Sequence, residues 1–266
     1  HAASLGASVR FVSLSGVDAS REFALKELTN VGVKAHLLAD DSRPTSLKQR
    51  FRCQGKSLLR VSQLHQGAMS TVLQKQMLAM IEDAIEGAQL LVFSDFNYGC
   101  LPQPLVEKIT EMARSRGMVI TADSQSSSQL GDISRFRGMD LITPTEHEAR
   151  LAMRNSDSGL VVLAESLRQQ CAAKNILLTM GAEGVLVHSG EMENSDWLTD
   201  RVEALNLAPR DVAGAGDSLL IASSLTLASQ GNIWQAACVG SLAAAIQIGR
   251  IGNIPIRSEE FYRVIN

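Results

Sequence analysis

This chain of 266 residues shows no excess of either charge, because 25 Lys and Arg face 28 Asp and Glu for a net charge of −3. The balance gives no sign of a nucleic-acid surface or an acidic tail. No apolar run approaches the ~20 residues of a membrane helix. Internal repeats, low-complexity tracts and interdomain linkers are also missing. We therefore expect a globular chain with a large core and with neither nucleic acid nor membrane as a partner.

Cysteine is scarce and scattered, without a Cys-x-x-Cys pair or any metal-ligand spacing; the four are Cys53, Cys100, Cys171 and Cys238. This excludes a disulfide framework and a structural zinc site as readings of the pattern. We expect reduced, mostly buried thiols and a cytoplasmic protein, with no signal peptide. The first residues resemble the tail of a helix turning into a strand, so we expect further chain before His1.

Strands and helices alternate through most of the chain. Apolar runs at residues 90–93, 119–122 and 175–180 are typical of buried parallel strands. Residues 20–30, 70–86, 104–116, 158–173 and 233–249 have helical spacing or composition. This alternation predicts an α/β fold in which helices cover both faces of a mostly parallel sheet.

Residues 34–64 interrupt that alternation with three short strands, which we expect at 34–38, 46–52 and 57–61. We predict a small antiparallel sheet, so that residues 1–33 and 65–266 form the core and 34–64 an inserted flap or lid. Positive charge gathers on it, at Lys48, Arg50, Arg52 and Arg60. A solvated sheet face is the commoner fate of such charges, and contact with an anionic substrate is the alternative.

Residues 211–217, Asp-Val-Ala-Gly-Ala-Gly-Asp, precede the apolar run 218–222. Small residues let the backbone approach a ligand closely, and the first turn of a helix presents N–H groups and a positive dipole end to an anion. Asp217 is then better placed as a general base beside a phosphate that the backbone holds than as the anion that the backbone binds. The competing interpretation is a glycine-rich loop that leads into a core helix.

Two other carboxylates stand where sites form in open sheets. Asp95 follows the strand at 90–93, and ligands gather beyond the carboxyl ends of parallel strands, although strand-end aspartates also cap helices. Glu148 falls in the first turn of a predicted helix, where an acidic residue is ordinary compensation of the helix dipole.

The order Asp211-x-x-Gly214-Ala215-Gly216-Asp217 resembles the signature of the ribokinase-like, or PfkB, carbohydrate kinases. The likeness covers essentially the whole chain, since the strand-turn-strand at 175–188 is similar to the family's nucleotide segment, 143–148 to its Asn-x-x-Glu region and 34–64 to its β lid. Within the family, residues 44–60, 94–101 and 135–144 are most similar to the heptose-7-phosphate kinase domain of ADP-heptose synthesis.

The resemblance implies a ribokinase-like fold that transfers phosphate from ATP, with Mg²⁺, to a hydroxyl of a sugar or sugar phosphate. Asp217 would be the base, and the N–H groups of Ala215, Gly216 and Asp217, with Gly214 shaping the turn, would hold the phosphoryl charge. Glu148 would organise the metal. The nucleotide residues would be Thr179, Gly181, Gly184 and Asp211, and the substrate residues Lys48, Arg50, Asp95 and Asp217.

The resemblance also suggests a monovalent cation near the C-terminal glycines, a homodimer formed through the lid and a fused nucleotidyltransferase domain. The chain departs from the family by losing a polar or cationic group at five positions: Thr145, Gln125, Tyr98, Ala213 and Leu242. It also begins after the family's opening strand, with its substrate-binding Asp and Gly-Gly hinge.

These departures leave a non-catalytic relative that binds a nucleotide or sugar as an alternative to the kinase. A Rossmann-type dehydrogenase is disfavoured, because no Gly-x-Gly-x-x-Gly follows the first strand.

Overall fold

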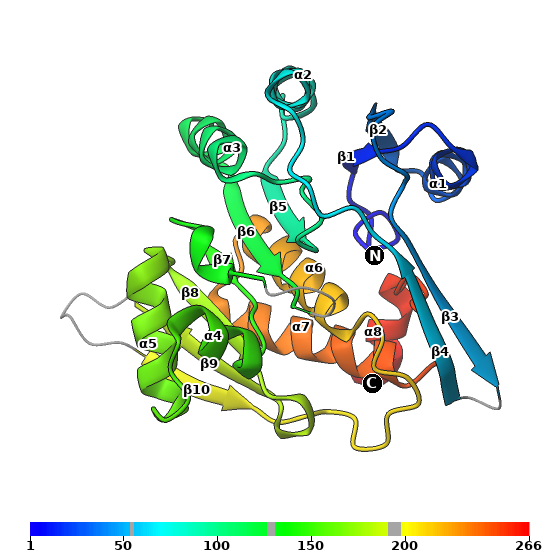
Figure 1. The fold of residues 1–266 in the computed structure, drawn as a ribbon. Coiled ribbons are helices and arrows are strands. Elements are labelled where there is room, and N and C mark those ends of the chain that lie inside the picture. Colours follow the sequence, from blue (N-terminus) through cyan, green and yellow to red (C-terminus); the bar gives the residue numbers. More distant parts are fainter. Residues whose placement is uncertain (54–55, 127–130, 191–197, 266) are drawn as a thin grey trace. The chain divides into compact units, whose positions relative to one another are not determined.

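A computed structural model describes residues 1–53, 56–126, 131–190 and 198–265. They divide into two compact units (Figure 1). The first unit comprises residue 1 and residues 89–97 and 113–266, and the second comprises residues 2–88 and 98–112. No helix within these described ranges combines the length and apolar character needed to span a bilayer.

The first unit is built on a sheet in the order β10-β9-β8-β7-β6-β5. Strands β5 (Leu90–Asp95), β6 (Val119–Ser124), β7 (Leu141–Ile142) and β8 (Asn175–Thr179) run parallel. β9 (Val185–Ser189) and β10 (Leu198–Val202) add antiparallel pairs at one edge. This confirms the prediction of a mostly parallel α/β sheet.

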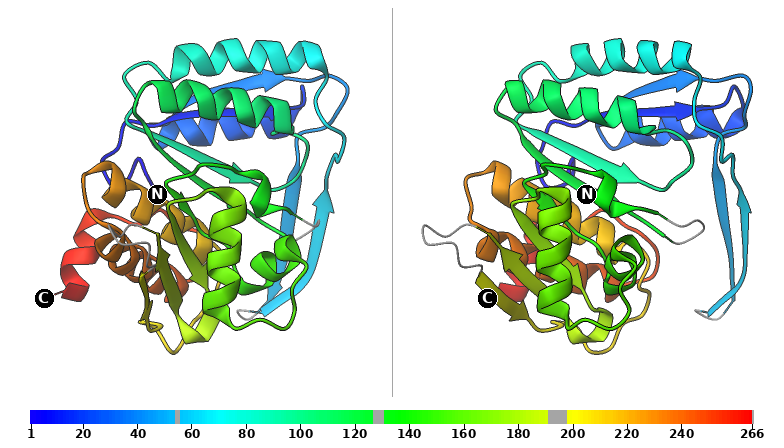
Figure 2. Two further views of the ribbon diagram at one scale, coloured as in Figure 1. Left: turned by 90° about the vertical axis from the view of Figure 1, so that its left-hand side faces the viewer. Right: turned by 60° about the vertical axis from the view of Figure 1, so that its left-hand side comes forward.

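Helices cover both faces of this sheet. α4 (Glu146–Met153) and α5 (Leu160–Cys171) pack on one face, and α6 (Ala215–Ala228) and α7 (Ile233–Ile248) pack on the other (Figure 2). α8 (Ser258–Ile265) follows α7 and contacts it. The parallel strands read as continuous apolar runs because both of their faces are buried.

Close packing of α6 against α7 explains the alanine content of α7. Ser223 Oγ on α6 donates to the carbonyl of Ala236 at 2.8 Å. A Cβ atom on Gly240 would collide with the same Ser223 Oγ. Small side chains therefore let the two backbones approach, and Leu219, Ile233 and Ala237 join strand residues in one apolar cluster.

The second unit holds a parallel pair and an antiparallel pair of strands. β1 (Arg10–Ser15) runs parallel to β2 (Lys34–Ala39), with α1 (Ala19–Asn30) connecting them. β3 (Leu47–Cys53) and β4 (Lys56–Gln63) are antiparallel. α2 (Thr71–Ala84) follows, and α3 (Gln103–Ser115) begins in this unit. The predicted small antiparallel sheet is therefore the β3–β4 pair, whereas the strand expected at 34–38 pairs in parallel with β1, with α1 as the connection.

A buried ionic cluster ties α5 to the antiparallel edge of the first unit's sheet. Glu165 accepts two bonds from Arg168, at 2.7 and 2.9 Å, and one from Gln169 at 2.6 Å. His188 on β9 lies 2.8 Å from Glu165 through Nε2 and 2.7 Å from Thr199 on β10 through Nδ1. The hydrogen bonds from Arg168 are the largest reason why the pKa of Glu165 is lowered to about 2, against a smaller opposing effect of burial.

The depressed pKa makes the stability contributed by Glu165 dependent on pH. In the unfolded chain this carboxyl titrates near its ordinary value of about 4.3, so its stabilisation is present above that pH and is lost as pH falls through about 2. At pH 7 we expect Glu165→Gln to lower the free energy of unfolding by about 2 kcal/mol, the usual worth of a hydrogen bond to a charged group. The difference from wild type should shrink between pH 5 and pH 2.

Urea denaturation followed by circular dichroism at several pH values would measure this difference. Glu183→Gln, at an exposed position in the same unit, serves as the control. A wild-type to Glu165→Gln difference that stays constant from pH 7 to pH 2 would contradict the assignment.

Candidate functional site

The glycine-rich loop of the first unit is shaped by Gly214. This residue is the N-cap of α6 with φ +82°, in the left-handed region, and a Cβ there would overlap the side chain of Asn253. Ala215 begins the helix and donates its N–H to the carbonyl of Val212 at 3.3 Å. Gly216 is exposed, with open space at its Cβ position. The loop therefore presents the first turn of α6 to its surroundings with little side chain in the way.

Asp211 braces this loop with both of its carboxylate oxygens. Oδ1 accepts the N–H of Ala213 at 3.2 Å, and Oδ2 accepts the N–H of Gly252 at 3.0 Å. Gln247, fully buried on α7, donates to the carbonyls of Ala213 at 3.1 Å and Gly252 at 2.8 Å. In this structure Asp211, predicted to bind nucleotide, fastens the loop before α6 to the chain after α7.

Asp217 lies in the first turn of α6 and receives a hydrogen bond across the sheet edge. The side-chain amide of Gln125, one residue after β6, donates to Asp217 Oδ1 at 3.0 Å. Two further carboxyl groups, those of Asp123 and Glu148, contribute to the electrostatics of this region. Asp123, 6% exposed, has its pKa raised well above the ordinary value, first by burial and then by the charges of Glu148 and Asp217. Both causes disfavour the charged form of the Asp123 carboxyl.

Glu148 is held at the N-terminus of α4 by a capping box. Its Oε2 accepts the backbone N–H and the hydroxyl of Thr145, both at 2.8 Å, while Thr145 Oγ1 accepts the N–H of Glu148. Its Oε1 accepts the N–H of Ser126 at 2.8 Å. Thr145, one of the departures from the family pattern, thus serves as the N-cap of α4. Ser126 follows Gln125 directly, so adjacent residues bond Glu148 and Asp217.

Asp95, at the end of β5, is 4% exposed and its carboxylate accepts three hydrogen bonds. Oδ1 accepts the N–H of Asn97 at 3.0 Å, and Oδ2 accepts from Arg135 at 2.7 Å and Ser124 at 3.2 Å. Asn97 adopts φ +60° and its amide donates to the carbonyl of Gln125 at 2.9 Å. The structure therefore places Asp95 as the support of the loop that carries Gln125.

The predicted nucleotide segment is the turn between β8 and β9. Gly181 and Gly184 have φ of +61° and +91°, and a Cβ on Gly184 would collide with the carbonyl of Val202. Thr179 donates its N–H to the carbonyl of Pro144 at 2.9 Å and forms an isolated parallel bridge with Thr145. The turn is thus attached to the N-terminus of α4, next to the cap that holds Glu148.

Three basic residues of the β3–β4 pair share one of its faces. Arg50 stands directly opposite Arg60, and Lys48 lies two residues along the same strand. All three are exposed, and the ammonium of Lys48 lies 5.2 Å from the centre of the Tyr98 ring. Like charges directly opposite each other destabilise a pair of strands. An anion bound on this face would relieve the repulsion.

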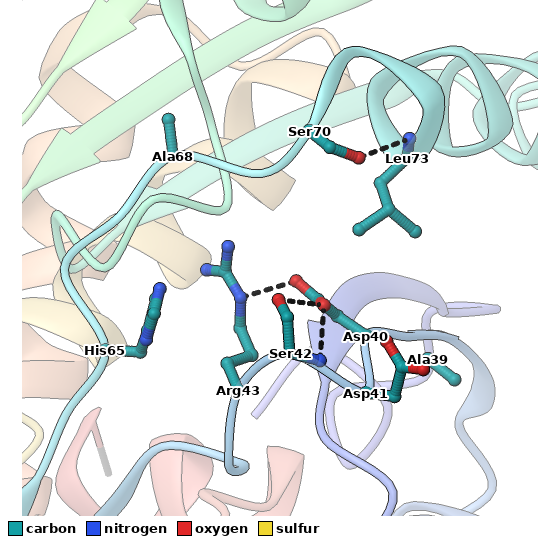
Figure 3. A pocket seen from close by; sticks show the side chains of 9 residues that line it. All are labelled: Ala39, Asp40, Asp41, Ser42, Arg43, His65, Ala68, Ser70 and Leu73. Atoms are coloured by element: carbon teal, nitrogen blue, oxygen red, sulfur yellow. Dashed lines mark hydrogen bonds and ion pairs between the residues drawn. The ribbon is translucent and has the colours of Figure 1, made fainter.

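A separate cavity of about 410 Å³ lies in the second unit (Figure 3) and holds none of the predicted site residues; its lining is Ala39, Asp40, Asp41, Ser42, Arg43, His65, Ala68, Ser70 and Leu73. Arg43 donates through Nε to Asp40 at 2.6 Å, and its buried Nη1 has no hydrogen-bond partner among the described residues. Figure 3 shows its guanidinium between His65 and Asp40. No sequence motif marks Arg43, although it directly precedes Pro44 in the segment that resembles the lid.

The site has a glycine-rich helix N-terminus with a carboxylate in its first turn, at the carboxyl edge of a mostly parallel sheet. This arrangement is typical of proteins that handle phosphate groups. Residues 1–259 match the model of the pfkB family carbohydrate kinases. The chain belongs to this family and is a carbohydrate kinase.

Known proteins agree with this assignment. The bifunctional protein HldE of Paramagnetospirillum magneticum is 26% identical over 260 residues, covering 96% of this chain and 51% of the relative. HldE of Stutzerimonas stutzeri is 28% identical over 270 residues, covering 99% and 53%. The chain thus spans about half the length of the curated relatives it matches.

Solved structures show the same fold. Escherichia coli phosphofructokinase-2 in complex with potassium has a TM-score of 0.78 at 17% identity, covering 99% of this chain and 83% of that one. Giardia lamblia ribokinase has a TM-score of 0.77 at 18% identity, covering 99% and 85%. The ribokinase-like fold expected from the sequence is confirmed.

We expect Gly214→Ala to lower the free energy of unfolding by about 2 kcal/mol. The left-handed conformation costs a non-glycine residue ~1–2 kcal/mol, and the new Cβ would collide with Asn253. Gly216→Ala is the matched control: it has room for a Cβ, does not have a positive φ and lies within a helix, so it should leave stability unchanged or raise it by up to ~1 kcal/mol. Denaturant unfolding of both variants measures this, and equal stabilities would contradict the geometry.

Proposed function

We propose that the protein transfers the γ-phosphoryl group of ATP to a hydroxyl of a sugar phosphate, with heptose 7-phosphate the first candidate. The hydroxyl oxygen bonds to the γ-phosphorus, the bond from that phosphorus to the bridging oxygen of ADP breaks, and the hydroxyl proton passes to Asp217. The observation that carries the proposal is the position of Asp217 in the first turn of α6, behind the left-handed Gly214. Backbone N–H groups stabilise charge that builds up on a transferring phosphoryl group.

The nucleotide would lie against the β8–β9 turn, at Thr179, Gly181 and Gly184. Support comes from the close attachment of that turn to the cap of α4. Asp211 would contribute by keeping the loop before α6 in shape.

Mg²⁺ binds hard oxygen ligands and commonly keeps several waters, with few protein carboxylates. Within the described ranges no group of three or more His, Cys, Asp or Glu side chains is arranged to hold a metal. The carboxylate of Glu148 is fixed by three hydrogen-bond donors. It fits a hydrated Mg²⁺ that needs few protein ligands because phosphate oxygens would hold it as well. The ion would neutralise charge on the transferring group.

The basic face of β3–β4 would hold the phosphate of the substrate through Lys48 and Arg50, with residues 34–64 acting as a lid over the core. The choice of heptose 7-phosphate rests on the resemblance of this segment to the heptose-phosphate kinase branch. Asp95 was predicted to bind the sugar, and its occupied carboxylate suits an indirect part in the site better.

The opposite face of the β3–β4 pair is apolar and suits a second copy of the chain. Phe51, Leu59 and Val61 are 50%, 55% and 42% exposed, and Phe51 stands opposite Leu59. An exposed apolar cluster of this kind marks an interaction surface, which supports the expected homodimer. A nucleotidyltransferase fused in the same protein is proposed from the half-length match to bifunctional relatives. A monovalent cation near the C-terminal glycines remains a prediction.

We expect Asp217→Asn to lower kcat by ~10²–10⁴-fold, the usual contribution of a general base, while ATP affinity changes little. ADP release should be measured with a panel of sugars and sugar phosphates, with Asp157→Asn, at an exposed loop position, as the control. Turnover that is the same in Asp217→Asn and wild type would refute the role. ATP binding in calorimetry without ADP release on any sugar would instead support the non-catalytic relative.

We expect Arg50→Ala and Arg60→Ala each to raise KM for the sugar phosphate by about tenfold, since one hydrogen bond to a charged group is worth ~1.5–3 kcal/mol. KM for ATP should stay the same. Both variants should also be slightly more stable than wild type, because the opposed cations are separated. Gln49→Ala, exposed on the other face of the strand, is the control. A parallel rise in KM for ATP, or for an unphosphorylated sugar, would contradict phosphate recognition.

A further inference from the structure

The side chain of Gln125 is the structure's direct link between the end of β6 and Asp217. Its amide donates to Asp217 Oδ1 at 3.0 Å, over a separation of 92 residues in the chain. Both side chains are half-buried. A carboxylate bonded at one oxygen by a fixed donor loses rotational freedom, so the direction of its second oxygen is set as well.

Gln125 can act as a fixed donor because its own backbone is held on both sides. Its N–H donates to the carbonyl of Asp95 at 2.9 Å, and its carbonyl accepts the amide of Asn97, also at 2.9 Å. Asn97 is fixed in turn by the buried carboxylate of Asp95. The loop after β6 is thus bound to the loop after β5, independently of α6.

We propose that Gln125 is a positioning residue that orients the carboxylate of Asp217 for proton abstraction. This rests on the proposed function, because it matters for catalysis only if Asp217 is the base. The amide sets the direction of the carboxylate and carries no charge of its own, so no cation is paired with the base. The neighbouring Ser126 N–H holds Glu148 in the same way, so one loop sets the orientation of both carboxylates.

The kinetic test compares Gln125→Ala, Gln125→Glu and Gln125→Asn with wild type. Gln125→Ala should lower kcat about tenfold to a hundredfold, with KM for sugar and for ATP within about threefold, because a badly oriented base affects the chemical step more than binding. Gln125→Glu should be lower still, since two carboxylates would face each other. Gln125→Asn, with a shorter amide, should recover part of the rate.

The matched control is Gln169→Ala. It removes another glutamine amide that donates to a carboxylate, that of Glu165, at 2.6 Å in the same unit. It should leave kcat unchanged. In an Asp217→Ala background, Gln125→Ala should have no further effect on the residual rate, because there is no carboxylate left to orient.

A kcat of Gln125→Ala within threefold of wild type, or a change confined to KM, would overturn the proposal. If the wild-type protein shows no kinase activity, the proposed function fails and a spectrum still tests the contact. In ¹H–¹⁵N spectra the Gln125 side-chain amide signals should shift in Asp217→Ala and stay in place in Asp157→Ala. Unmoved signals would show that the hydrogen bond is not formed.

Discussion

Burial of a carboxyl group beside two other carboxylates is the constraint around which the candidate site is organised. Asp123, Glu148 and Asp217 come from three different elements, and burial first, then the charges of Glu148 and Asp217, raise the pKa of Asp123. Glu148 and Asp217 keep hydrogen-bond donors instead. The loop after β6 supplies one donor to each, through Ser126 and Gln125.

The two basic regions of the second unit differ in how far their positive charges are compensated. Arg43 is buried and satisfied in part by Asp40, so it contributes to local structure as well as to the cavity it lines. Arg50 and Arg60 are exposed and face each other across the strands. Solvent screens such an exposed pair, which lowers the cost of the repulsion.

Local sequence patterns predicted most of the elements. Helical spacing located α1, α2, α3 and α5 to within a few residues, and the acidic first turn at Glu148 belongs to a helix, as expected. Asp211, Glu148 and Asp95 were predicted as site residues from the sequence, and the structure adds their partners: the N–H of Gly252 for Asp211, the cap residue Thr145 for Glu148 and the side chain of Arg135 for Asp95. A sequence motif identifies the residue types in a loop. It does not identify the hydrogen-bond donors that the folded chain brings to those residues.

The sequence by itself determined the α/β alternation, the glycine-rich loop before α6 and the resemblance to a kinase family, because each follows from short-range periodicity, composition or motif order. Tertiary structure alone decided that β2 pairs in parallel with β1, that Glu165 meets His188, and that Gln125 reaches Asp217. These contacts join residues far apart in the chain. Their geometry depends on the packing of whole helices and strands, which no window of neighbouring residues contains.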